Sequence, residues 1–181
     1  PPRYVSLEER LSQAIRTIPD FPSPGIHFKD ITPIFLDPQL VQDCVQALAA
    51  PYRGLGITKV LGIDSRGFLM GPMLAQELGA GFVIVRKKGK LPAVTYEVSY
   101  DLEYGSSTIE VHQDAVTAAD KVLIHDDLLA TGGTARATAE LAQQHSGAQV
   151  LGFSFIVTLG FLSGHEKLEA YAQHVHELVK F

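Results

Sequence analysis

The sequence is poor in residues that could stabilise a fold through covalent or metal cross-links. It holds one cysteine in 181 residues, so an intramolecular disulfide is excluded. The seven histidines show no metal-ligand spacing with that cysteine. We therefore expect Cys44 to be a small, buried apolar residue.

Long apolar runs and an excess of positive charge are also missing. The longest apolar runs are far shorter than the roughly 20 residues that a membrane-spanning helix needs. The first residues, PPRYVSLEER, lack the apolar core of a signal peptide. Lys and Arg number 15 against 20 Asp and Glu, a net charge of −5, which argues against broad binding to nucleic acid. These absences predict a cytoplasmic protein with no membrane and no nucleic-acid partner.

The residues that are present suit a single globular domain. The chain is 46% hydrophobic and 19% charged, and a chain of this length buries a sizeable core. No repeat, low-complexity tract or linker divides it. We therefore expect one domain that spans residues 1–181.

The N-terminal part is expected to form two helices joined by an irregular loop. Ser6 and Glu9 make a capping box at the start of an amphipathic helix. Residues 19–33 contain four prolines and a glycine, which interrupt regular structure. A second helix is predicted to start at Asp37 and Pro38, an acid at the cap followed by proline in the first turn.

From residue 59 onward, apolar strands and helices alternate. Buried strands are predicted at 59–64, 81–87, 121–125 and 149–159, and helices at 67–79 and 133–147. Residues 92–114 are polar at alternate positions and flank a glycine, which predicts an antiparallel excursion or a mobile loop. The pattern predicts an α/β fold with a mainly parallel, twisted sheet flanked by helices on both faces.

Charged or glycine-rich segments follow each of the four predicted parallel strands. They are DSRG (64–67), RKKGK (86–90), DDLLATGGT (126–134) and TLGFLSG (158–164). Because parallel strands end at one edge of a sheet, these segments are expected to face one crevice, where such sheets bind ligands.

The third of these segments predicts a ligand with two different ends. Residues 130–134 join a strand to a helix, so free N–H groups and the helix dipole favour a phosphate there. The turn has neither the lysine of a nucleoside-triphosphate loop nor the dinucleotide pattern. Asp126 and Asp127 can accept hydrogen bonds from a ribose diol, although adjacent acids also occur as a cap or a surface pair. Ribose 5-phosphate satisfies both halves of the segment.

The remaining cations at this edge suggest a second anion. Arg66, Arg86 and Lys90 could hold a pyrophosphate, which is usually carried with Mg²⁺. Two simpler interpretations stay open: residues 86–90 as a solvated loop, and Arg66 as the structural partner of Asp64.

The segment VLIHDDLLATGGT (122–134) resembles the thirteen-residue phosphoribosyl-pyrophosphate signature of the type I purine and pyrimidine phosphoribosyltransferases. Further segments resemble the members of that family that act on adenine. They are DFPSPGIHFKDITPI, GIDSRGFLMGPMLAQELG, RKKGKLP and SYDLEYG. They occur in the family's order and cover residues 19 to about 162. The resemblance implies transfer of a 5-phosphoribosyl group from phosphoribosyl pyrophosphate to adenine, giving AMP and pyrophosphate in purine salvage.

The resemblance also implies the parts of the molecule and their roles. Residues 1–35 would form an N-terminal helix and base-binding hood, and residues 88–110 a flexible catalytic loop. Mg²⁺ would be held mainly through the substrate, and the chain would form a homodimer in which Arg86 reaches the partner. The Asp64–Ser65 peptide would be cis. Glu103 is the implied acid/base and, with Arg66, a catalytic candidate. The implied binding residues are Asp126 and Asp127 for the ribose diol; Ala130, Thr131, Gly132, Gly133 and Thr134 for the 5′-phosphate; Asp64, Ser65, Arg66, Arg86, Lys87 and Lys90 for pyrophosphate; and His27, Phe28, Lys29 and Leu159 for adenine.

Several roles stay open at this point. The His27 side chain either faces solvent while its backbone recognises the base, or is catalytic. Glu103 either transfers a proton or only supports loop closure. Thr158 stands where family members often have an acid, and His125 replaces a usually apolar residue. The alternative functions are transfer to another base, a non-catalytic regulator that senses phosphoribosyl pyrophosphate, and a plain nucleotide-binding module.

Overall fold

The computed structural model describes residues 2–102 and 104–181. Its helices are α1 Leu7–Ala14, α2 Pro38–Ala49, α3 Gly67–Glu77, α4 Gly133–Glu140 and α5 Gly164–Leu168. Its strands are β1 Arg16–Ile18, β2 Phe28–Asp30, β3 Lys59–Ile63, β4 Gly81–Lys87, β5 Thr95–Asp101, β6 Ser106–His112, β7 Lys121–Leu129, β8 Gln149–Thr158 and β9 His174–Lys180. Short 3₁₀ turns cover Thr32–Leu36, Ala50–Tyr52 and Gly160–Leu162, and a π-helical turn, Leu141–His145, continues α4.

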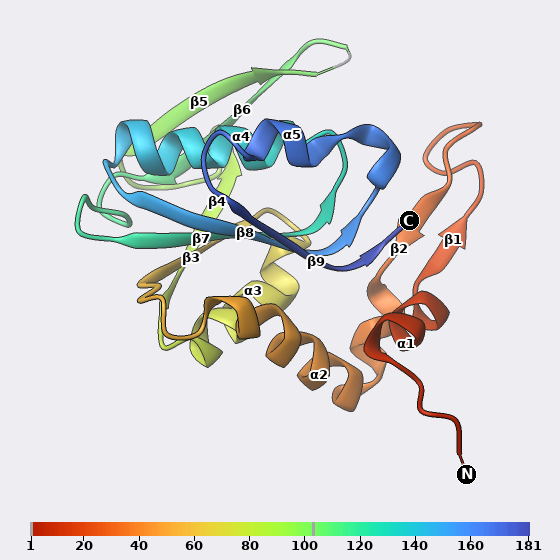
Figure 1. The fold of residues 1–181 in the computed structure, drawn as a ribbon. Coiled ribbons are helices and arrows are strands. Elements are labelled where there is room, and N and C mark those ends of the chain that lie inside the picture. The colour runs from red at the N-terminus through yellow and green to blue at the C-terminus, as the bar shows by residue number, and fades with distance from the viewer. Residues whose placement is uncertain (1, 103) are drawn as a thin grey trace.

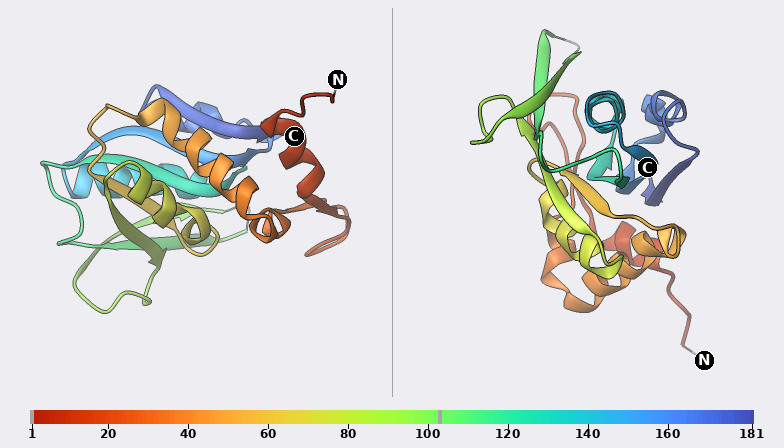
Figure 2. Two further views of the ribbon diagram at one scale, coloured as in Figure 1. Left: turned by 90° about the horizontal axis from the view of Figure 1, so that it is seen from below. Right: turned by 90° about the vertical axis from the view of Figure 1, so that its left-hand side faces the viewer.

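A seven-stranded sheet forms the centre of the molecule, in the order β5-β6-β4-β3-β7-β8-β9. The strands from β4 to β9 in this order are parallel to their neighbours, and β6 and β5 are antiparallel additions. Helices α2 and α3 cover one face, and α4 and α5 cover the other (Figures 1 and 2). The predicted α/β class, with a mainly parallel sheet between helical layers, is confirmed.

Each helical layer encloses its own apolar core. On the α4 side the core includes Ile124, Phe153 and Leu141, and on the α2 and α3 side it includes Leu123 and Met70. Neighbouring residues of one strand enter different cores because successive side chains point to opposite faces of a sheet. The central strands are therefore apolar on both faces, which explains the continuous apolar runs in the sequence.

The N-terminal part differs from the prediction in one respect. The Ser6 hydroxyl accepts a hydrogen bond from Glu9 N at 3.1 Å, as the predicted capping box requires. The stretch 19–33, expected to be irregular, contains β2, which pairs antiparallel with β1. An ion pair of 2.8 Å between Arg16 and Asp30 joins the two strands. Three of the four prolines precede β2 and Pro33 follows it, so none lies within the strand and it is free to pair.

The second helix and the middle of the chain follow the predictions. Asp37 caps α2 by accepting hydrogen bonds from two main-chain N–H groups. Cys44, a residue of this helix, is fully buried, as predicted. Strands β5 and β6 form the expected antiparallel excursion, which projects beyond the sheet (Figure 1). It joins β4 through the pairs of Arg86 with Glu110 and Lys87 with Ile109, and Lys88 N donates to the oxygen of Thr108 at 2.9 Å. The hairpin is thereby attached at the carboxyl end of β4.

The last part of the chain adds an element that the sequence did not predict. β9 pairs parallel to β8 at the edge of the sheet. Its side chains are mostly half-buried, so it lacks the long apolar run of the central strands. In the part of the chain that the structure describes, no helix is long and apolar enough to cross a membrane.

Candidate active site

The carboxyl ends of β3, β4, β7 and β8 bring the predicted site segments to one edge of the sheet. β7 is longer than expected, because it continues past His125 to Leu129. Asp126 and Asp127 therefore lie inside the strand and do not follow it. Their side chains leave opposite faces of the sheet, so each acid has different neighbours.

Asp126 lies on the side of residues 130–134, the turn that is predicted to bind phosphate and is called the phosphate turn. Its carboxylate is half-buried and accepts a hydrogen bond from Asp127 N at 2.8 Å. Burial and the neighbouring charge of Asp127 raise the pKa of Asp126 well above its usual value. This acid is therefore poised to bind a hydroxyl either as donor or as acceptor.

Asp127 contacts an arginine on the other side. Its side chain is 4% exposed, and its Oδ2 lies 3.0 Å from Nε of Arg66. The Arg66 guanidinium carbon also lies 5.2 Å from the centre of the Phe28 ring. Arg66 thus connects the acid predicted to bind the sugar with the loop predicted to bind the base.

The turn after β7 encloses a hollow of about 100 Å³, lined by Asp126 and by residues 128–135. Gly132 is the N-cap of α4 and has φ +83°, a left-handed conformation that favours glycine. No side chain caps this helix, so the N–H groups of its first turn are available to a ligand. A Cβ at position 132 would lie 2.8 Å from the main-chain oxygen of Gly164. The turn is therefore held tightly against the segment that begins α5.

Sequence reasoning missed one residue of this site, Tyr100 on β5. Its hydroxyl lies 2.8 Å from Oγ1 of Thr134 in the first turn of α4, and the residue is 8% exposed. It lines a second cavity of about 120 Å³ whose polar lining residues are Asp64, Arg86, Lys87, Tyr100, Asp126 and Thr134. The signal was available in the alternation of β5, since Val98 and Tyr100 are its buried positions.

The end of β4 and the segment after β3 meet through an ion pair between Arg86 and Asp64. Nε of Arg86 lies 2.9 Å from Oδ2 of Asp64, and Nη1 of Arg86 donates to the main-chain oxygen of Lys90 at 3.4 Å. The Asp64–Ser65 peptide is cis, as the resemblance implied. The alternative in which Arg66 pairs with Asp64 is wrong, because Arg86 is the partner of Asp64. Lys87 and Lys90 are exposed.

The predicted base-binding residues lie on two separate elements. Phe28 is half-buried in β2 and packs edge-to-face on Phe21 at 5.2 Å, while the neighbouring His27 is exposed. Leu159 follows β8, is half-buried, and donates its N–H to the oxygen of Leu129 at 2.9 Å. The exposed imidazole agrees with the interpretation in which the His27 side chain faces solvent.

Three comparisons with known proteins agree on the family. The Phosphoribosyl transferase domain family matches residues 35–178. A curated adenine phosphoribosyltransferase of Cereibacter sphaeroides (strain KD131) is 51% identical over 167 residues, which cover 92% of this chain and 93% of that protein. The crystal structure of adenine phosphoribosyltransferase from Rhodothermus marinus superposes with a TM-score of 0.91 at 52% identity, covering 97% of this chain and 98% of that one.

A third relative was solved with ligands. Adenine phosphoribosyltransferase of Saccharomyces cerevisiae, complexed with an imino-altritol bisphosphate and adenine, has a TM-score of 0.87 at 41% identity and covers 94% of this chain and 97% of that one. The chain belongs to the adenine phosphoribosyltransferase family. Membership accounts for the order of the site segments along the chain, from the segment predicted to bind the base to the turn predicted to bind phosphate.

Within this family fold, the two residues that depart from the family pattern, His125 and Thr158, are both buried. His125 is fully buried, and neither ring nitrogen has a hydrogen-bond partner among the described residues. Its Cδ2 lies 3.6 Å from the place where a Cβ of Gly71 in α3 would lie, and burial lowers its pKa to about 4. Thr158 is 1% exposed. His125 is therefore a neutral packing residue on the α3 side, away from the phosphate turn.

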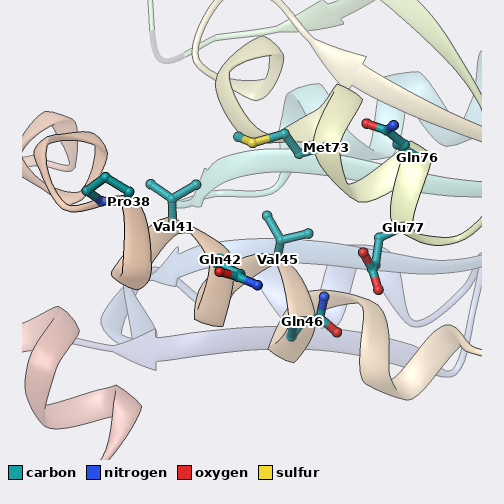
Figure 3. Close-up of a pocket in the computed structure, with 8 residues that line it drawn as sticks. All are labelled: Pro38, Val41, Gln42, Val45, Gln46, Met73, Gln76 and Glu77. Carbon is teal, nitrogen blue, oxygen red and sulfur yellow. The ribbon is translucent and has the colours of Figure 1, made fainter.

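One catalytic candidate, Glu103, lies outside the described residues. Its neighbours Leu102 and Gly105 are joined by a main-chain hydrogen bond of 2.9 Å at the tip of the β5–β6 hairpin. A groove of about 420 Å³ between α2 and α3 is the largest of the described hollows (Figure 3). None of the predicted site residues that the structure describes borders it, and the polar side chains that line it there, three glutamines and Glu77, offer no cation to a phosphate.

Proposed function

We propose that this chain binds phosphoribosyl pyrophosphate across the carboxyl edge of its sheet and transfers the 5-phosphoribosyl group to adenine, giving AMP and pyrophosphate. The observation that carries the proposal is the arrangement of this edge. A phosphate-sized hollow at a helix N-terminus lies beside the half-buried Asp126, and the buried Asp127 and two arginines lie beyond it. Family membership identifies the ligand that combines these features.

The 5′-phosphate would occupy the hollow at the start of α4. The N–H groups of residues 132–134 and the hydroxyls of Thr131 and Thr134 would donate to it, and the helix dipole favours its charge. The hydroxyl of Tyr100 would hold Thr134 in place from the hairpin side. The ribose diol would then reach the acids of β7.

Binding of the diol changes the partner of Arg66. A hydroxyl that donates to Asp127 competes with the Arg66 ion pair of 3.0 Å. A displaced Arg66 becomes available to the pyrophosphate, together with Arg86, Lys87 and Lys90. These cations would stabilise the charge that develops on the leaving pyrophosphate. Ser65 would add main-chain contacts in the same loop.

Magnesium is the expected companion of the pyrophosphate. The described residues include no cluster of three or more His, Cys, Asp or Glu side chains that could hold a metal, whereas the oxygens of the substrate are the hard donors that Mg²⁺ prefers. The metal would neutralise charge on the pyrophosphate when bound. Because Asp64 is already paired with Arg86, the metal would be held mainly through the substrate.

Adenine would bind between the Phe28 ring and Leu159, with main-chain groups of His27 and Lys29 at its edge. Adenine carries an exocyclic amine donor where hypoxanthine and guanine carry an acceptor, so main-chain carbonyl groups at the start of β2 would favour adenine. Glu103 would accept the proton of the incoming base. Residues 1–35 would act as the hood over the base, and residues 88–110 as the loop that excludes water.

One assay tests the reaction and its base. The protein with Mg²⁺ and phosphoribosyl pyrophosphate is incubated with adenine, hypoxanthine or guanine, and pyrophosphate release is measured. Adenine is expected to be the best acceptor by a wide margin. Faster release with hypoxanthine would contradict the base assignment. Binding of the phosphorylated sugar without consumption of any base would favour the regulator.

A pair of glutamate variants tests the proton transfer. Glu103→Gln should lower kcat and leave the affinity for phosphoribosyl pyrophosphate unchanged. Glu97→Gln is the matched control, because Glu97 lies on the same hairpin and pairs with Lys88 at the surface. Wild-type turnover in Glu103→Gln would remove the acid/base role.

We also propose that the chain forms a homodimer in the cytoplasm. Residues 81–85 of β4 pair with β3 but not with β6 in the described structure. Ile84 on this strand and Leu69 on α3 are large apolar residues with 37% and 42% exposure. A second copy could cover them. Sedimentation velocity should give twice the chain mass, and a monomer at assay concentration would contradict this.

A further inference from the structure

Phe181, the residue that follows β9, contacts both sides of the proposed adenine pocket. Its N–H donates to the oxygen of Thr158 at 2.9 Å, and its main-chain oxygen accepts from Gly160 N at 2.9 Å. These bonds continue the β8–β9 pairing by one residue. Leu159, one proposed wall of the pocket, is therefore flanked on both sides by residues that Phe181 holds.

The Phe181 side chain contacts Lys29, the residue that follows Phe28, the other proposed wall. Nζ of Lys29 lies 4.1 Å from the centre of the Phe181 ring, within the range of a cation–π interaction. The same Nζ donates to Oγ1 of Thr17 at 2.8 Å, so the contact reaches both strands of the hairpin. Phe181 is 36% exposed, which leaves its ring partly shielded from water. Figure 1 shows the end of the chain beside β2.

This contact matters because the β1–β2 hairpin forms its own two-stranded sheet. In the described structure its strands pair with each other and with no strand of the seven-stranded sheet. No ladder of main-chain hydrogen bonds therefore sets the position of the hood relative to Leu159. Side-chain contacts must set this position. The contact between Lys29 and Phe181 is one of them, because Phe181 is hydrogen-bonded to both neighbours of Leu159.

We propose that Phe181 is a positioning residue for adenine, which holds the hood and Leu159 at the separation that the base requires. The proposal rests on the proposed function, because it assumes that Phe28 and Leu159 bind the base. Loss of the ring contact lowers the fraction of molecules in which the pocket is assembled. The apparent affinity for adenine falls by that fraction, whereas the phosphate turn of α4 is built from other elements and keeps its affinity.

The test uses substitutions that leave both main-chain bonds of Phe181 in place. Phe181→Leu keeps an apolar side chain but removes the ring face, and it should raise KM for adenine about two- to fivefold. KM for phosphoribosyl pyrophosphate should stay at the wild-type value. Phe181→Tyr keeps the ring and should keep the wild-type KM for adenine. Tyr4→Leu, an aromatic to leucine change at a residue with 88% exposure, is the matched control.

A double variant separates the contact from other effects. Lys29→Met should raise KM for adenine by a similar factor, and Lys29→Met combined with Phe181→Leu should be no worse than the worse single variant. Additive effects, an unchanged KM for adenine in Phe181→Leu, or equal increases in both KM values would overturn the proposal. If Phe181→Leu fails to fold, the other two variants test the proposal. A wild-type KM for adenine in Lys29→Met would overturn the proposal, and so would a raised KM for adenine in Phe181→Tyr.

The failure of the proposed function would look different. In that case the wild-type protein would release no pyrophosphate with adenine, and no KM for adenine could be measured. A wild-type enzyme that uses adenine normally while Phe181→Leu is unchanged refutes only the positioning role.

Discussion

Replacing Gly132 with alanine tests how tightly the phosphate turn is built. Gly132 has φ +83°, and a Cβ there would lie 2.8 Å from the main-chain oxygen of Gly164. The left-handed backbone costs a non-glycine residue about 1–2 kcal/mol. The collision adds to this cost, because optimal separations between non-bonded heavy atoms are about 3.5–4.0 Å. One of the two main chains must move, and that of Gly132 lines the phosphate hollow.

A matched glycine separates the two contributions. Gly54 has φ +75° and no atom within 4 Å of its ideal Cβ, so Gly54→Ala introduces the backbone strain without the collision. For a chain of this size, about 1 kcal/mol corresponds to roughly 2–4 °C in Tm. The backbone strain of about 1–2 kcal/mol in Gly54→Ala should therefore lower Tm by roughly 2–8 °C. The kinetics of this variant should be unchanged. Gly132→Ala should lower Tm further.

The activity of Gly132→Ala carries the main prediction. A displacement of about 1 Å at a binding site can reduce catalysis by about a hundredfold. We expect kcat/KM for phosphoribosyl pyrophosphate to fall about ten- to a hundredfold, measured by pyrophosphate release at saturating adenine. The reasoning is refuted by a Gly132→Ala protein with wild-type kcat/KM and the same Tm as Gly54→Ala, because the turn would then not require glycine.

Three further predictions concern single side chains. Asp127→Asn should weaken phosphoribosyl pyrophosphate about ten- to a hundredfold in calorimetric titrations, since a charge-assisted hydrogen bond is worth about 1.5–3 kcal/mol; an unchanged Kd would exclude the diol role. Tyr100→Phe removes the hydroxyl that contacts Thr134 and should lower kcat/KM for the same substrate about three- to tenfold, whereas Tyr96→Phe on the same strand should have no effect. Burial lowers the pKa of His125 to about 4. Below pH about 6.5 the His125 side chain is therefore protonated in the unfolded chain but stays neutral in the folded chain, so the free energy of unfolding decreases as the pH falls toward 4. The free energy of unfolding should therefore fall between pH 7 and pH 5 by about 2 kcal/mol more in the wild type than in His125→Leu, and equal urea-unfolding curves for the two would contradict the buried neutral ring.

Local sequence patterns were enough for the central elements of the fold. The four parallel strands predicted from apolar runs are present, because β3, β7 and β8 are buried over most of their length and β4 carries only apolar residues from Gly81 to Val85. The cap at Asp37 and the antiparallel excursion also follow from residues close together in the chain. The edge strand β9 was missed, because it is mostly half-buried and polar residues interrupt its apolar ones on both faces.

The strand boundaries near the site could not be predicted from the pattern. Two adjacent acids indicated an end of the strand at His125, but β7 continues because β8 pairs with it as far as Leu129. The prolines in residues 19–33 concealed β2, which exists because β1 offers it a partner. In both places the partner strand lies far away in the sequence or beyond a turn, so a local pattern carries no sign of it.

The sequence by itself determined which segments meet at the carboxyl edge, because the alternation of strands and helices places every strand end there. It also determined the chemistry available at that edge: two acids, a glycine turn and a group of cations. Only the tertiary structure decided which side chains are partners. Arg66 contacts Asp127 while Arg86 contacts Asp64, Tyr100 reaches Thr134, and Phe181 meets Lys29. These choices depend on the face from which each side chain leaves its strand and on the distance between elements that the chain separates by many residues.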